Sequence, residues 1–127
     1  MIRQRFRVEH YWEVVVFYDL DYNLFSVVAK ELRKIGFSRV NLETLYDEMR
    51  HGDALAVTCS SIRKHKSIVI FNKHASKANY ISSLVHEAEH VKQAMLAAYY
   101  VEDKGEPPAY TIGYLVMRMW EVFRELL

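Results

Sequence analysis

Residues 11–18 read Tyr-Trp-Glu-Val-Val-Val-Phe-Tyr, and this run constrains the fold more than any other segment. Aromatic and β-branched side chains favour extended backbone, and Glu13 is the only residue of the eight that is not apolar. The run therefore predicts a strand that is mostly buried. A buried strand needs other strands beside it and cover on its faces, so the rest of the chain must supply a sheet and the helices that pack on it.

The remaining segments alternate between helical and extended patterns. Asp21 and Asn23 are candidate N-caps for the first helix and Gly36 is a natural residue to follow it, while Asn41 and Ser76 are the caps expected for two later helices. The full prediction is a strand at 11–18, helices at 24–35 and 42–49, an antiparallel hairpin at 54–60 and 66–71, a helix at 76–98, a loop at 99–105, and a helix from Pro107 or Pro108 to the C-terminus. This β-α-α-β-β-α-α order predicts one α+β domain over 1–127, with a small antiparallel or mixed sheet packed against helices.

Length, charge and cysteine content exclude several classes of protein. The 127 residues fit one domain of ordinary size. The 17 Lys and Arg residues balance 16 Asp and Glu residues, whereas a protein built to bind nucleic-acid phosphates carries a basic surplus. The single cysteine, Cys59, excludes an intramolecular disulfide framework and a cysteine-based zinc site, and we expect it to be a buried small side chain. No apolar run approaches the ~20 residues of a membrane span and no signal-peptide core follows the basic N-terminus, which predicts a soluble, cytoplasmic protein.

The segment at 76–98 contains His86-Glu87-Ala88-Glu89-His90, which matches the pattern H-E-x-x-H. Four residues are close to one helical turn, so both imidazoles project from one face and can share a Zn²⁺ ion at ~2.0–2.1 Å each. Glu87 points about 100° away from His86, which lets its carboxylate approach an activated water without being a close ligand. It can then take a proton from the attacking water and give it to a leaving amine. The pattern predicts metal-assisted hydrolysis.

A third ligand is expected downstream, because a catalytic zinc site uses three protein ligands. Glu106 follows His90 with fifteen residues between them. If the helix ends near Ala98, the chain runs ~12 Å past His90 along the helix. The next seven or so residues can span ~23 Å when extended, which is enough to return Glu106 to the metal. The alternative third ligands are His74, Glu102 and Asp103.

A competing interpretation needs no metal. His86 and His90 would then be ordinary helix residues with solvated glutamates around them, and Glu106 would only favour the start of the last helix through its charge. The position of the histidines favours the metal, because they lie beside the apolar stripe of the helix. The residues that share their flank are small and let another segment approach closely: Ser83, Ala94 and Ala97.

The stretch SIVIFNKHASKANYISSLVHEAEHVKQAM, followed by GEPPAYTIGYL, resembles small H-E-x-x-H proteins of bacteriophages and bacterial mobile elements. These proteins are similar to minimal gluzincin-type zinc metallopeptidases. The resemblance covers the second half of the chain well and the first half only by its layout. The family pattern is a strand, a serine at a helix start, H-E-x-x-H, an acidic residue before an Ala-Tyr pair, and a helix with a glycine. The matching positions are Ile68 to Phe71, Ser76, His86 to His90, Glu106, Ala109-Tyr110 and Gly113. Gly52-Asp53 before the hairpin also fits.

This resemblance implies a zincin-like domain that hydrolyses a peptide or protein substrate. His86, His90 and Glu106 would be the zinc ligands and Glu87 the general base. Tyr110 would face the oxyanion or, alternatively, be a half-buried packing residue. The resemblance also implies that the strand at 67–71 presents an edge to which an extended peptide can pair, while the sequence itself leaves open which edge of the sheet is free.

Two other functions remain open at this point. The chain can be a catalytically inactive zincin-like interaction protein of a phage or mobile element, with a structural zinc ion or none. The basic tip of the hairpin, together with the basic N-terminus, can also contact nucleic acid, although a solvated turn explains it more simply and the charge balance argues against this function. These basic residues are Arg3, Arg5, Arg7, Arg63, Lys64, His65 and Lys66. The sequence leaves the oligomeric state open.

Overall fold

The structure is a computed structural model that describes residues 1–126. A four-stranded mixed sheet forms its middle layer. The strands, in the order in which they lie side by side, are β1 (Ile2–Val8), β2 (Trp12–Tyr18), β4 (Lys66–Phe71) and β3 (Ala56–Ser61). The helices are α1 (Phe25–Lys34), α2 (Arg39–Arg50), α3 (Lys77–Ala98) and α4 (Glu106–Phe123), with short 3₁₀ turns at Tyr22–Leu24 and Arg124–Leu126. The fold is α+β, as predicted. In residues 1–126 we find no helix that combines the length and the hydropathy of a membrane span.

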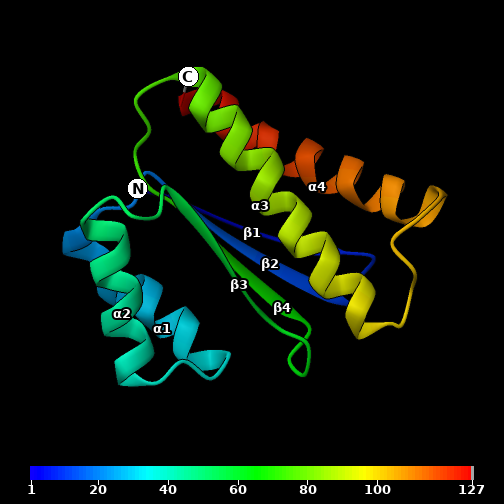
Figure 1. Ribbon diagram of the computed structural model, residues 1–127, viewed down its shortest axis with the longest axis horizontal. Coiled ribbons are helices and arrows are strands. Elements are labelled where there is room, and N and C mark those ends of the chain that lie inside the picture. Colours follow the sequence, from blue (N-terminus) through cyan, green and yellow to red (C-terminus); the bar gives the residue numbers. More distant parts are fainter. Residues whose placement is uncertain (127) are drawn as a thin grey trace.

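The helices cover the sheet on both faces, α1 and α2 on one side and α3 and α4 on the other (Figure 1). Alternate residues of a strand point to opposite faces. Val14 and Val16 of β2 therefore pack against α3 and α4, while Val15 and Phe17 pack against α1 and α2. This double cover explains why the run at 11–18 is almost continuously apolar, and it confirms the predicted buried strand.

The first strand is a correction to the predicted order, which becomes ββ-αα-ββ-αα. From Arg3 to Val8, three exposed arginines alternate with side chains that are partly or fully buried, and Phe6 and Val8 are the buried ones. Because three of these residues are arginines, the segment looks like a charged N-terminus and not like a strand. In the structure β1 pairs with β2 in antiparallel register, Phe6 opposite Val14, and it is an edge strand.

Local signals placed most helix ends correctly. Ser76 caps α3 through the Asn79 backbone, as predicted. Asp21 caps the 3₁₀ turn at Tyr22–Leu24 by accepting a hydrogen bond from the Asn23 backbone, whereas Leu24, at the N-cap of α1, makes no side-chain cap hydrogen bond. Gly36, with φ of +100°, follows α1 in the left-handed conformation that glycine adopts most readily. The predicted cap at Asn41 is wrong, because Ser38 caps α2. Asn41 instead completes a capping box, in which its side chain accepts a hydrogen bond from the Ser38 backbone.

β3 and β4 form the antiparallel hairpin that the sequence predicts. The edge expected at residues 67–71 is wrong, because β4 is also paired in parallel with β2 and is therefore an inner strand. The free edge on this side of the sheet belongs to β3. The strand that can pair with an extended peptide is thus the one before β4 in the chain.

A buried ion-pair cluster joins β1, β4 and α1. Glu31 of α1 is only 3% exposed, and its carboxylate accepts hydrogen bonds from Lys66 Nζ at 2.9 Å and from the Arg5 guanidinium at 2.6 Å. Glu13 contacts the same two cations. Burial alone would raise the pKa of Glu31, but the hydrogen bonds and charges of Lys66 and Arg5 outweigh it and lower the pKa to about 2. The cluster therefore stays ionised over the whole neutral range.

Candidate metal centre

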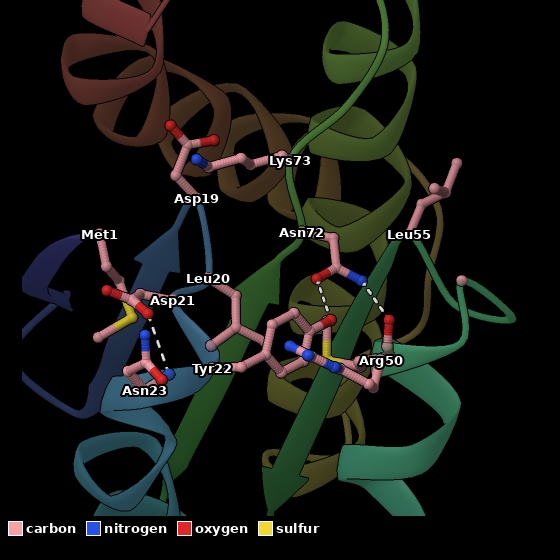
Figure 2. Close-up of a pocket in the computed structure, with 12 residues that line it drawn as sticks. Met1, Asp19, Leu20, Asp21, Tyr22, Asn23, Arg50, Leu55, Asn72 and Lys73 are labelled. Atoms are coloured by element: carbon pink, nitrogen blue, oxygen red, sulfur yellow. Dashed lines mark hydrogen bonds between the residues drawn. The ribbon is translucent and has the colours of Figure 1, made fainter.

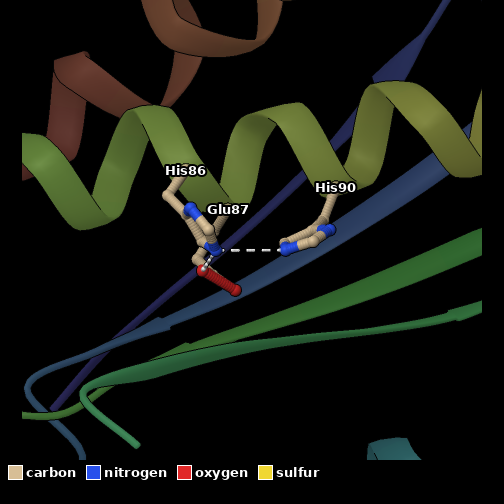
Figure 3. Close-up of side chains that lie close together, drawn as sticks. All are labelled: His86, Glu87 and His90. Atoms are coloured by element: carbon tan, nitrogen blue, oxygen red, sulfur yellow. Dashed lines mark hydrogen bonds and ion pairs between the residues drawn. The ribbon is translucent and has the colours of Figure 1, made fainter.

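His86, Glu87 and His90 lie together on the side of α3 that faces β3 (Figure 3). The two Nε2 atoms are 3.1 Å apart, and His86 Nε2 is 3.9 Å from Glu87 Oε2. One donor atom from each of the three residues lies within 4.8 Å of the others. Both imidazoles are exposed, and the His86 side chain is 69% exposed, so a metal ion and a substrate can reach the ring nitrogens from solvent.

The spacing of the two rings suits a shared metal ion. Two nitrogens that each lie ~2.0–2.1 Å from one tetrahedral ion are about 3.3–3.4 Å apart, close to the 3.1 Å between His86 Nε2 and His90 Nε2. The same distance also suits an N–H···N hydrogen bond between two neutral imidazoles. Both arrangements need the rings one helical turn apart and aimed at the same point, which α3 provides. The group can therefore hold a metal ion.

Glu87 differs from the two histidines because its side chain is buried. The residue is 4% exposed, and Thr58 of β3 donates a hydrogen bond from Oγ1 to Glu87 Oε1 at 3.1 Å. In residues 1–126, the one cationic group within 4 Å of this carboxylate is the imidazole of His86, and only when that ring is protonated. A buried carboxylate is stable when it is paired or lies beside a metal ion. The geometry of Glu87 therefore favours a positive charge next to the two rings.

A depression of about 440 Å³ opens beside this group. Its walls come from α3, through Ser82, Ser83, His86 and Glu87, and from the segment that leads into β3, Asp53 to Ala56. Ser83, one of the small residues expected beside the histidines, lines this depression. Sequence reasoning did not propose Asp53 as a site residue. Its only signal was the Gly52-Asp53 pair in the family pattern, which gave no reason to place a carboxylate beside His86.

Glu106 does not belong to the group. It is the first residue of α4, is exposed, and follows Gly105 at a helix N-terminus, where its charge favours the helix without any metal. α4 packs on α3 and contacts β1 at the opposite edge of the sheet from β3. Because His86 and His90 face β3, the helix that carries Glu106 lies on the other flank of α3. The structure thus brings together His86, Glu87 and His90 and leaves Glu106 apart.

The three alternative ligands also lie outside the group, and each has another partner. Asp103 forms an ion pair with the buried Lys92 at 2.8 Å. Glu102 pairs with Lys104 at 3.0 Å. His74 uses both ring nitrogens, Nδ1 with the Asn72 carbonyl and Nε2 with the Ser83 hydroxyl, each at 2.7 Å. His74 and Asp103 thus have partners within the fold, whereas Glu102 is in an exposed surface ion pair.

Tyr110 lies near the start of α4 and is 74% exposed. It lines an apolar cleft at the far end of α3, together with Tyr11 and Tyr99, and this cleft includes neither His86 nor Glu87. The structure therefore places Tyr110 away from the metal-ligand group.

Two of the basic residues and the cysteine have partners or surroundings within the fold. Lys66 is paired with Glu13 and Glu31, and Arg5 joins the same cluster, so these cations already face carboxylates. Cys59 is partly buried on the α1 and α2 side of β3. Burial, together with the charge of Glu87, raises the pKa of the Cys59 thiol to about 12, which keeps it protonated at neutral pH.

No protein-family model, no curated protein and no solved structure matches this chain. The resemblance to gluzincin-type proteins therefore stays a prediction.

Proposed function

We propose that this chain is a zinc-dependent peptidase in which His86 and His90 bind the metal and Glu87 is the general base. One observation carries the proposal: two imidazole nitrogens 3.1 Å apart lie beside a buried carboxylate, at the edge of a depression that is open to solvent. When bound, Zn²⁺ would supply Lewis-acid activation of a water molecule and of the scissile carbonyl. Imidazole nitrogen is among the ligands that zinc binds most readily.

Glu87 is suited to the proton transfers of hydrolysis. Its Oε1 is held by the Thr58 hydroxyl, while its Oε2 is the oxygen nearer to His86. Oε2 is thus placed to accept the proton of an attacking water and to return it to the leaving amine. The hydrogen bond from Thr58 fixes the carboxylate in this orientation before a substrate arrives.

A third ligand is still required for a catalytic zinc site of the usual kind. Asp53 is the best candidate for this ligand, because it lines the same depression as His86 and Glu87 from the opposite wall. Carboxylate oxygen is an accepted zinc ligand beside two histidines.

The free edge of β3 supports a peptide as the substrate. The Asn72 backbone N–H donates to the Leu55 carbonyl at 3.0 Å, so these two residues form a hydrogen-bonded pair across the hairpin. Because such pairs alternate along an antiparallel ladder, the backbone groups of Ala56, Thr58 and Ser60 point away from β4. An extended peptide can pair with these groups and pass below His86 and Glu87.

One observation favours a second function. In the described residues the group offers two imidazoles and one carboxylate, and Glu106 lies elsewhere. A protein that retains this fold as an inactive interaction module would have the same features. Metal content alone does not separate the two functions, whereas hydrolysis does.

The first experiment tests metal binding. We expect the purified protein to bind Zn²⁺ in isothermal titration calorimetry, and His86→Ala and His90→Ala to weaken binding by more than about 100-fold, since even residues that only support a ligand change metal affinity about 10–100-fold. His51→Ala is the matched control, because His51 is exposed at the end of α2 and its ring hydrogen-bonds to the Asp47 carbonyl of the same helix. Unchanged zinc affinity in both motif variants would refute the proposal.

A second experiment tests how Glu87 is positioned. Thr58→Val keeps the shape of the side chain and removes the hydrogen bond to Glu87, so we expect peptide hydrolysis to fall by about 10–150-fold, which corresponds to the ~1.5–3 kcal/mol of one hydrogen bond to a charged group. Thr111→Val is the control, because Thr111 donates to the Pro107 carbonyl within α4. Equal rates for both variants in an assay with quenched fluorogenic peptides would show that Thr58 does not position the base.

A further inference from the structure

The parallel strands β2 and β4 create a second place for a ligand, away from the metal-ligand group. They lie side by side, but the chain leaves them toward opposite faces of the sheet. After β2 it enters α1 on one face, and after β4 it enters α3 on the other (Figure 1). Where neighbouring parallel strands diverge in this way, a crevice opens beyond their carboxyl ends, and ligands of open α/β sheets bind in such crevices.

A crevice of about 700 Å³ lies at this position (Figure 2). Its volume is within the ~300–1,000 Å³ that small-molecule sites occupy. The residues that follow β2 and β4 form its centre, and the end of α2 forms a wall. Those used below are Asp19, Asp21, Tyr22, Arg50, Asn72 and Lys73.

The walls of the crevice are fixed by hydrogen bonds. Asn72, which is 8% exposed, donates from Nδ2 to the carbonyls of Met49 and Ala54, and its Oδ1 accepts a hydrogen bond from Tyr22 Oη at 2.6 Å. One amide side chain therefore ties together the segments that follow β2, α2 and β4 (Figure 2). Asp19 adopts φ of 55°, an uncommon conformation for a residue other than glycine, and accepts a hydrogen bond from Tyr80 Oη. A site with fixed walls needs little reordering when it binds.

Charges of both signs line the crevice without neutralising one another. In residues 1–126, neither Arg50 nor Lys73 has a carboxylate oxygen within 4 Å, and neither Asp19 nor Asp21 has a cationic nitrogen within that distance. The Arg50 guanidinium lies over the Tyr22 ring, 4.8 Å from its centroid, which holds the cation at the wall. Arg50 and Lys73, together with Asp19 and Asp21, match a ligand that carries both signs of charge.

The same arrangement argues against a polyphosphate ligand. Phosphate sites in such folds use free backbone N–H groups at the start of a helix. Here the Asp21 carboxylate accepts from the Asn23 backbone at 2.9 Å, so it occupies that position with a negative charge. Asp19 adds a second carboxylate nearby. Asp19 and Asp21 would repel a ligand that carries several phosphate charges. A ligand with a single carboxylate can instead place that group against Arg50 and Lys73.

We propose that this crevice binds a small zwitterion, a free amino acid or a short peptide with free ends. Arg50 and Lys73 bind its carboxylate, and Asp19 and Asp21 bind its ammonium group. The site goes beyond the peptidase function proposed above and does not depend on it, because neither His86 nor Glu87 lines the crevice.

The experiment uses the full chain after removal of metal with a chelator, so that no ligand can bind through zinc. The probes are a pool of the free amino acids of proteins and a pool of dipeptides, each tested by the shift in thermal unfolding and then resolved into single compounds. We expect at least one zwitterion to raise Tm, and its N-acetylated and C-amidated forms to bind roughly tenfold or more weakly, because each lacks one charge. Inorganic phosphate and a nucleoside monophosphate test the other anions.

Variants place the binding site. Arg50→Gln and Asp21→Asn each remove one charge, and asparagine preserves the helix cap, so we expect both to weaken binding roughly tenfold. Lys64→Gln removes an exposed cation at the hairpin tip and should change nothing, and His86→Ala should bind as tightly as the unmodified chain. The proposal is overturned if neither pool raises Tm, if blocked peptides or phosphate bind as well as zwitterions, if both crevice variants bind normally, or if His86→Ala abolishes binding.

Discussion

Glu87→Gln is expected to retain Zn²⁺ and to lower kcat for peptide hydrolysis by about 10³-fold, within the ~10²–10⁴-fold range of general base catalysis. Glutamine has the size of glutamate, and its amide oxygen can still accept the hydrogen bond from Thr58. It cannot accept a proton from the attacking water. Because His86 and His90 are unchanged, metal binding and hydrolysis should separate in this variant.

The measurement is the release of fluorescence from a randomised pool of internally quenched peptides, with the zinc content of each sample determined in parallel. Glu89→Gln is the matched control within the same motif, because Glu89 pairs with Lys92 and is not part of the His86, Glu87 and His90 group. Equal loss of activity in the two variants would mean that Glu87 is not the base. Zinc binding without hydrolysis by the unmodified chain would instead support the inactive interaction protein.

Glu31→Gln is expected to lower the free energy of unfolding by about 3–5 kcal/mol, the usual effect of removing one partner from a buried ion pair. In this variant the ammonium group of Lys66, which is mostly buried, loses the negative charge of Glu31. Chemical denaturation in urea measures the difference. Glu43→Gln is the control, because Glu43 pairs with Arg39 on the exposed face of α2 and such surface pairs contribute less than about 1 kcal/mol. A comparable loss in both variants would contradict the role assigned to the buried cluster.

The same cluster predicts how stability depends on pH. The pKa of Glu31 falls from the ordinary 4.5 to about 2 in the folded protein. Its contribution, on the order of 3 kcal/mol, is therefore complete above pH 4.5 and is lost as the pH falls toward 2. Urea denaturation between neutral and acid pH should show a steeper loss for the unmodified chain than for Glu31→Gln, which lacks the group. Parallel pH profiles would refute this assignment.

Features set by neighbouring residues could be predicted from the sequence. The run at 11–18 became the buried strand β2, and the spacing of His86 and His90 placed both rings on one face of α3. Ser76 capped α3 as expected, because a cap depends on residues three apart. In each of these cases the physical cause lies within one or two turns of chain.

Features set by distant contacts could not be predicted in this way. The arginines of β1 fit in a strand because they have partners in the folded protein, and one of these partners, Glu31, lies on α1. The chain between His90 and Glu106 is long enough to bring Glu106 back to the metal. Its length sets only the maximum distance, however, and not the direction in which the chain runs. The direction of α4 is set by Leu115, Met119 and Phe123, which pack into the core against the sheet and α3. This packing keeps Glu106 apart, while the loop before β3 brings Asp53 to the depression instead.

The two imidazoles sit on one uninterrupted helix, capped by Ser76 at its start and tied near its end by Lys92 to Asp103. Their separation is thus governed by helix pitch rather than by loop motion. Any ion bound there would link two residues of a single turn of α3, and local unfolding of that turn would release the ion. Occupancy of the centre would consequently report whether this stretch of backbone is intact, and chelation would slow its local opening.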